Sequence, residues 1–266
     1  MAETIEYEGL IEPNVVVEIG APAEGIVDAV TVDRGSVIEK GQVLVKLESS
    51  VERAAVEKTA KMATFKGEIN LQQDQLAFAK RVHQRVGRLA VISAQEKDQA
   101  ATEILLTTHR LEKARENRIL AEFELKKARA LLAHRTVKSP LPGVVVDRYV
   151  SPGEYVNTQP LLRVAQIDPL RVEVIVPAAM FGKISPGMTA TIIPELPRYG
   201  ERTATVTIVD RVIDSASSTF GVRLTLPNPD RQVPSGLKCL VRFESGEPAN
   251  RSSEMTLGTG IDPAQN

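Results

Sequence analysis

Residues 21–50 have the sequence APAEGIVDAVTVDRGSVIEKGQVLVKLESS, in which Gly25, Gly35 and Gly41 separate short β-branched runs. An offset of 118 residues aligns this segment with SPLPGVVVDRYVSPGEYVNTQPLLRVAQ, residues 139–166. The offset pairs Pro22 with Pro140, Gly25 with Gly143, Val27 with Val145, Val32 with Val150, Gly35 with Gly153 and Leu44 with Leu162. Glycines at such positions mark bends that a β-carbon would resist. The two segments are therefore predicted to form one β-sandwich that the intervening residues interrupt.

Residues 51–133 contain no proline and are rich in strong helix formers, which predicts two long helices. Apolar residues follow a 3-4 spacing through both arms, at nine of twelve positions in the first and eight of eleven in the second. The first predicted seam is Val51, Ala55, Lys58, Met62, Phe65, Ile69, Gln72, Leu76, Ala79, His83, Val86 and Ala90. The second is Lys97, Ala100, Ile104, Thr107, Leu111, Ala114, Arg118, Ala121, Leu125, Ala128 and Leu132.

The two predicted seams fit an antiparallel pairing, because facing positions add to the constant 183. Met62 then faces Ala121 and is expected to pack in the core, and the bend falls near Val91 and Ile92. Arms of about 39 residues would make a rod about 60 Å long. Some apolar residues lie off the seam, among them Leu105, Leu106, Ile119, Leu120, Phe123 and Leu131. They are either ordinary exposed residues or a lateral packing face, and the sequence leaves both open.

Residues 168–245 carry about six β-rich runs separated by turns such as Pro186-Gly187 and Asn228-Pro229, which predicts a small antiparallel barrel. The last residues, 246–266, are polar and rich in turn formers, which is typical of disorder or of the remnant of a membrane-proximal region.

Composition excludes several classes of function. The formal charge is −1, aromatic residues are 4% and Trp is absent, so nucleic acid is not an expected partner. Cys239 is the single cysteine, lies in the alternating run GLKCLVRFE and is predicted to be a small packed strand residue. No apolar run reaches 18 residues, and the start MAETIEYEG lacks the pattern of an export signal, so Met1-Ala2 is consistent with a start that replaced a native leader or anchor.

The sequence carries none of the common catalytic motifs. The sequence has no Gly-x-Ser-x-Gly elbow, phosphate loop or His-Glu-x-x-His pattern. His83, His109 and His134 are spread along the predicted hairpin, where they cannot converge on one metal ion. We therefore expect no catalytic, cofactor-binding or metal-binding residues and a protein that is not an enzyme.

The pattern VDRGSVIEKGQVLVKLES followed by SPLPGVVVDRYVSPGEYV resembles a lipoyl or biotinyl domain whose carrier hairpin has been opened. Carrier domains present a modifiable lysine in that hairpin, whereas this chain has Glu48-Ser49-Ser50 leading into the first helix. One alternative is still a carrier protein in which Lys40 or Lys46 bears the lipoyl or biotinyl group. A second is a structural coiled-coil scaffold without a transporter partner.

The order of half sandwich, helical hairpin, half sandwich and barrel resembles the membrane fusion proteins, the hemolysin-D-like periplasmic adaptors of tripartite efflux and secretion pumps, over about residues 9–245. The resemblance implies a mainly β fold in which a long antiparallel α-helical hairpin projects from a split lipoyl-like domain beside a β-barrel. It assigns 14–50 and 136–167 to the lipoyl-like domain, 51–135 to the hairpin, and 3–13 and 168–245 to the barrel. It also implies a periplasmic location at the inner membrane, with export of drugs, toxic compounds or other cargo.

The same resemblance implies three partners: an inner-membrane transporter, an outer-membrane channel and further copies of the chain in a trimeric or hexameric ring. Relatives that meet a channel carry Arg-x3-Leu-x6-Ser at the hairpin tip. Here Arg85 and Leu89 keep the first spacing, while Ser93 follows Leu89 after only three residues. Counting back from Ser93 at the family spacing reaches Val86 and Val82 instead. Arg85, Leu89 and Ser93 are the candidate docking residues, and Ser93 is also predicted to cap the second helix together with Glu96.

Overall fold

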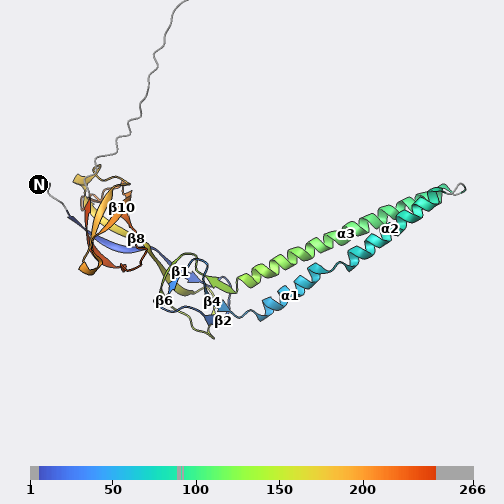
Figure 1. The fold of residues 1–266 in the computed structure, drawn as a ribbon, viewed down its shortest axis with the longest axis horizontal. Coiled ribbons are helices and arrows are strands. Elements are labelled where there is room, and N and C mark those ends of the chain that lie inside the picture. Colours follow the sequence, from blue (N-terminus) through green and yellow to red (C-terminus); the bar gives the residue numbers. More distant parts are fainter. Residues whose placement is uncertain (1–5, 89–90, 92, 244–266) are drawn as a thin grey trace, which may run out of the picture. The chain divides into compact units, whose positions relative to one another are not determined.

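Figure 1 shows the computed structural model of the chain, which describes residues 6–88, 91 and 93–243. The chain divides into two compact units. One contains the residues up to Val15 and from Gln166 onward, and the other contains Val16–Ala165. The first is a β-barrel, and the second joins a β-sandwich to a long helical hairpin. The predicted fold class, mainly β with a helical hairpin, is confirmed.

Six strands form the barrel: β1 (Glu6–Gly20), β8 (Pro160–Pro177), β9 (Thr189–Pro194), β10 (Arg202–Val209), β11 (Thr219–Leu226) and β12 (Leu237–Phe243). They pair in the order β1-β12-β9-β10-β11-β8, and a further pairing of β1 with β8 closes the sheet. Every second residue of β11 is buried, as strand alternation requires. Two short 3₁₀ turns, η1 (Ala178–Met180) and η2 (Pro197–Tyr199), lie in the connections.

The sandwich is built from β2 (Gly25–Val30), β3 (Val37–Ile38), β4 (Val43–Leu47), β5 (Thr136–Lys138), β6 (Gly143–Arg148) and β7 (Tyr155–Val156). The end of β1 and the start of β8 also contribute to its core. Antiparallel pairs β2–β7, β3–β6 and β4–β5 each join a strand that precedes the hairpin to one that follows it. The two halves therefore share their hydrogen bonds as well as their core. The prediction of one sandwich opened by an insertion is confirmed.

The repeat offset of 118 residues is also visible in the hydrogen bonds between the two halves. The amide of Gly35 donates to the carbonyl of Val145 at 2.8 Å, and Val145 donates back to Ser36 at 3.0 Å. At the equivalent positions, Gly153 donates to Val27 at 2.8 Å and Val27 donates to Glu154 at 2.9 Å. Both glycines have a positive φ, +84° and +89°, which other residues rarely adopt. The halves thus bind one another reciprocally, as a pseudo-twofold pair.

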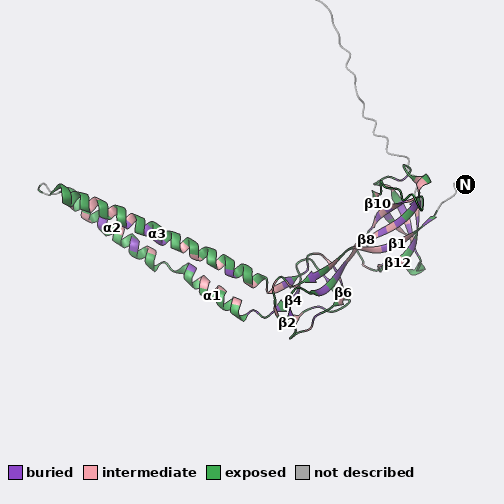
Figure 2. Ribbon diagram, turned by 180° about the vertical axis from the view of Figure 1, so that it is seen from behind, coloured by how far each residue is buried: buried purple, intermediate pink, exposed green. Residues whose placement is uncertain are grey.

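Three helices form the hairpin: α1 (Ser50–Thr64) and α2 (Gly67–Arg88) make the first arm, and α3 (Ala94–Ala133) makes the second (Figure 1). The predicted seam of the second arm is confirmed, because ten of its eleven positions are buried or half-buried, Lys97 being the exception. In α2 the predicted seam also faces inward, with Gln72 and Ala79 buried, except at His83. His83 is exposed and the neighbouring Val82 is half-buried, so the prediction for His83 is wrong. Away from this seam most of the hairpin is exposed, in contrast to the strands (Figure 2). Leu105, Leu106, Ile119, Leu120, Phe123 and Leu131 are all exposed.

The prediction for α1 is wrong by one residue. Met62 is 50% and Phe65 70% exposed, whereas Ala63 is 8% exposed and faces the seam. The inward positions of α1 are Glu52, Val56, Thr59 and Ala63 in place of Val51, Ala55, Lys58 and Met62. The change of phase coincides with a break between α1 and α2, where Phe65 is extended with ψ 126°. Because the first arm is not one continuous helix, its two parts have different phases, and Met62 is not a core residue.

Cys239 lies on β12 and is buried in the barrel core, as predicted. Burial raises the pKa of its thiol to about 12. The folded barrel therefore favours the neutral thiol, and this preference stabilises the fold. The stabilisation is complete below the unfolded pKa of about 8.5 and is lost as the pH rises from there towards 12.

We expect the Cys239 thiol to react with Ellman's reagent at pH 8 at least about 100 times more slowly in the folded protein than in urea, because labelling requires the barrel to open. The measurement is absorbance at 412 nm against time. A native rate close to the unfolded rate would contradict the burial of this thiol.

Candidate partner-docking site

The candidate docking site is the end of the hairpin, where α2 gives way to α3. Arg85 is exposed in the last turn of α2, and Ser93 is exposed directly before α3. Leu89 and Ile92 lie outside the described residues. The docking role of Leu89 and the predicted bend at Ile92 therefore stay predictions. Val91 lies between α2 and α3 and is 95% exposed.

Ser93 begins α3 with a complete capping box. Its side-chain oxygen accepts from the amide of Glu96 at 3.2 Å, and the Glu96 carboxylate accepts from the amide of Ser93 at 3.0 Å. The Ser93 hydroxyl also donates to that carboxylate at 2.8 Å, and this bond is the main reason that the pKa of Glu96 is lowered. The predicted capping role is therefore confirmed, while docking by Ser93 remains a prediction.

A basic face precedes the tip on α2. Arg81, Arg85 and Arg88 follow the helical spacing i, i+4 and i+7, so they lie on one side of the helix, and Lys80 is next to them. Val82 and Val86, one residue further along, are half-buried against α3. None of the four cations forms an ion pair with another described residue. Their charge is therefore available to a partner with an acidic surface.

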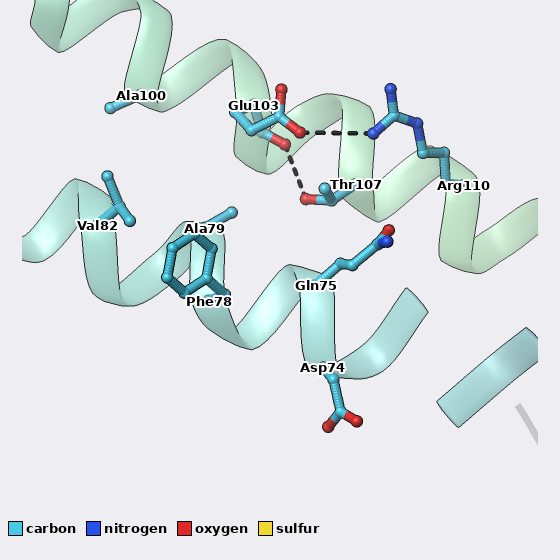
Figure 3. A pocket seen from close by; sticks show the side chains of 9 residues that line it. All are labelled: Asp74, Gln75, Phe78, Ala79, Val82, Ala100, Glu103, Thr107 and Arg110. Carbon is cyan, nitrogen blue, oxygen red and sulfur yellow. Dashed lines mark hydrogen bonds and ion pairs between the residues drawn. The ribbon is translucent and has the colours of Figure 1, made fainter. Parts of the chain in front are cut away.

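A shallow groove of about 610 Å³ lies between α2 and α3, a few turns from the tip (Figure 3). Phe78, Ala79, Val82 and Ala100 supply its apolar part. On α3, the Glu103 side chain accepts from Arg110 Nη1 at 3.4 Å, and its carbonyl accepts from Thr107 Oγ1 at 2.7 Å (Figure 3). These contacts belong to a helix–helix interface, and the groove holds no nucleophile paired with a base among its described lining residues.

Three further features bear on function: metal ligands, membrane-spanning helices and the lysines Lys40 and Lys46. Across residues 6–88, 91 and 93–243, no cluster of three or more His, Cys, Asp or Glu side chains could hold a metal ion. Within the same ranges, no helix is both long and apolar enough to cross a bilayer. Lys40 is exposed in the turn between β3 and β4, and Lys46 is exposed within β4, where it pairs with Ala29 and Thr136. Neither lysine stands at the apex of the opened carrier hairpin.

Residues 15–166, more than half of the chain, match the family described as CzcB-like, barrel-sandwich hybrid domain. The chain belongs to this family of membrane fusion proteins. The match covers the sandwich and the whole hairpin, and it therefore includes both segments that the 118-residue offset relates. The family relation therefore rests on the same segments as the sequence prediction.

Individual relatives agree with this membership. The pyoverdine export membrane fusion protein PvdR of Pseudomonas aeruginosa is 28% identical over 190 residues, 68% of this chain and 49% of that protein. The chain spans about half the length of the curated relatives it matches.

Two solved structures share the fold. MacA from Actinobacillus actinomycetemcomitans has a TM-score of 0.67 at 20% identity, over 92% of this chain and 79% of that one. The membrane fusion protein Spr0693 from Streptococcus pneumoniae R6 has a TM-score of 0.63 at 18% identity, over 92% of this chain and 100% of that one.

One interaction at the base of the hairpin was missed by sequence reasoning. Arg135, just after α3, donates to the Glu52 carboxylate and to the carbonyl of Glu24, each at 2.6 Å. Gly25 leaves room for it, since a β-carbon there would lie 2.6 Å from Arg135 Nη1. The only sequence signal was Gly25 itself, because Glu52 and Arg135 are 83 residues apart.

Proposed function

We propose that this chain is the adaptor part of an export pump, linking an inner-membrane transporter to an outer-membrane channel in the periplasm. The observation that carries the proposal is the hairpin, which has two arms packed along a seam. Its described residues enclose no site, and a β-sandwich split to receive it holds it at its base. Such an arm is suited to bridging distance between two proteins. The relative PvdR is a pyoverdine export membrane fusion protein, which supports an export role here.

The proposal assigns separate contacts to the parts of the chain. The tip, with Arg85, Leu89 and Ser93, would dock on the channel, and the basic face of Arg81, Arg85 and Arg88 would meet acidic side chains there. The barrel would lie towards the transporter. Self-association into a trimeric or hexameric ring would let individually weak tip contacts act together, because linked sites bind at a high effective concentration.

A photo-crosslinking amino acid at Arg88 tests the proposal in cells that carry the native neighbouring genes. We expect ultraviolet light to join this position to an outer-membrane channel protein identified by mass spectrometry. Reversing the charge with Arg85→Glu should reduce that product several-fold, because the acidic partner then meets a like charge. Arg129→Glu, an exposed position at the other end of α3, is the matched control and should leave the yield unchanged.

Two results would contradict the assignment. In the first, an assembled, membrane-associated protein gives no crosslink from Arg88 to any outer-membrane protein. In the second, Arg85→Glu and Arg129→Glu reduce the yield equally, which would mean that the effect comes from total charge and not from the tip.

A further inference from the structure

Helix α1 carries two competing apolar faces. The face turned to α3 contains Val56 and Ala63, while Val51, Met62 and Phe65 on the neighbouring face are exposed. The two faces are one residue apart, a rotation of about 100° around the helix axis. The exposed face includes the larger side chains, so the packing observed is not the one that buries the most apolar area.

The exposed face of α1 is continuous with the seam of α2, and the buried face is not. Continued through 3-4 steps, Met62 and Phe65 lead to Ile69, Gln72 and the rest of the α2 seam. The same steps taken from Ala63 arrive one residue out of phase. The break at Phe65 and Lys66 absorbs this difference, and Phe65 keeps only a short-range bond from its amide to the Met62 carbonyl at 3.2 Å.

An ion pair holds α1 in the observed phase. Glu52 occupies the first inward position of α1, and its carboxylate lies 2.6 Å from Arg135 Nη2, with the two side chains only 17% and 23% exposed. Arg135 is fixed from the other side by the Glu24 carbonyl. Turning α1 by one residue would place Val51 where Glu52 now lies and carry the carboxylate away from Arg135.

The other side of the seam has an arginine at the level of the break. The predicted register places Arg118 of α3 opposite Phe65, and Arg118 is half-buried, with its Nε 3.3 Å from the carboxylate of Glu122 on the same helix. An aromatic ring turned inward there would cover the Arg118 stem and could stack on its guanidinium. The α3 surface therefore offers a place for Phe65.

We propose that α1 is a two-position helix, held in the position seen by the Glu52–Arg135 ion pair. When that pair is broken, α1 turns by about one residue, about 100°, so that Val51, Met62 and Phe65 pack against α3 in place of Val56 and Ala63. The break at Phe65 and Lys66 then closes, and α1 and α2 become one helix. A group that competes for Glu52 or Arg135 at the hairpin base would thereby change the whole first arm.

Thiol labelling at two adjacent positions distinguishes the two phases in the full chain. Met62→Cys and Ala63→Cys are made separately, and the slow buried Cys239 serves as an internal background. In the otherwise unchanged protein, we expect Cys at 62 to react with a maleimide at least about ten times faster than Cys at 63, because a protected site must open before it reacts. With Glu52→Lys added, like charges face each other at Arg135, and this ratio should invert.

Glu57→Lys is the matched control, because Glu57 lies on the same helix in an exposed ion pair with Lys61 and takes no part in the seam. It should leave the ratio as in the unchanged protein. An unchanged ratio in Glu52→Lys overturns the proposal. Fast labelling at both positions, with loss of helical circular dichroism, also overturns it, since α1 then detaches from α3 instead of turning.

Discussion

Leu44→Ala and Leu162→Ala should each lower the free energy of unfolding of the sandwich by about 3–5 kcal/mol, because truncation of a buried leucine loses transfer energy and leaves a cavity. Both side chains are fully buried in the same core. They are also equivalent under the 118-residue offset, with equivalent neighbours in Val27 and Val145. We therefore expect the two losses to be nearly equal.

Urea unfolding followed by circular dichroism measures both losses, with the unchanged protein as reference. Leu131→Ala is the matched control, because Leu131 is exposed on α3, and its truncation should cost less than about 1 kcal/mol. If the two halves pack equivalently, the two cavities should cost similar amounts of free energy. Losses that differ by more than about 2 kcal/mol would therefore contradict equivalent packing.

The sandwich was predictable from sequence because its signal is repeated. Gly35 and Gly153 both adopt a positive φ in equivalent turns, so the same constraint acts at both positions of the chain. The seam of α3 was predictable for a different reason: α3 is unbroken for 40 residues, and a constant periodicity then gives a constant face. Turns that require a positive φ and helices with an unbroken apolar periodicity can therefore be predicted from a single sequence.

The phase of α1 could not be predicted, because it depends on a contact between distant parts of the chain. The 3-4 spacing favoured Met62 and Phe65, whereas the structure turns Ala63 inward and holds Glu52 at Arg135. At the tip, the capping box of Ser93 was predictable, since its partner Glu96 is three residues away. The docking role of Arg85, Leu89 and Ser93 involves a second protein and stays a prediction.

Asn228 was likewise not singled out beyond its turn with Pro229, yet it organises one end of the barrel. It is fully buried, and its Nδ2 donates to the carbonyls of Ile167 at 2.9 Å and Val233 at 3.0 Å. Its Oδ1 accepts from the Val233 amide at 3.2 Å. Its own amide donates to Asp168 Oδ1 at 3.0 Å. One side chain thus satisfies three backbone groups of two separate segments.

We expect Asn228→Ala to lower the free energy of unfolding of the barrel by about 3–5 kcal/mol, because each buried backbone group left without a partner costs about 1–3 kcal/mol. Asn228→Asp keeps the shape and the acceptor but turns a carboxylate oxygen towards two carbonyls, so its loss should be at least as large. Urea unfolding, with the Cys239 labelling rate as a probe inside the barrel, measures both. Asn70→Ala is the control, because Asn70 is exposed on α2, and it should change the stability little. A loss below about 1 kcal/mol for Asn228→Ala would contradict the prediction and would mean that water replaces these hydrogen bonds.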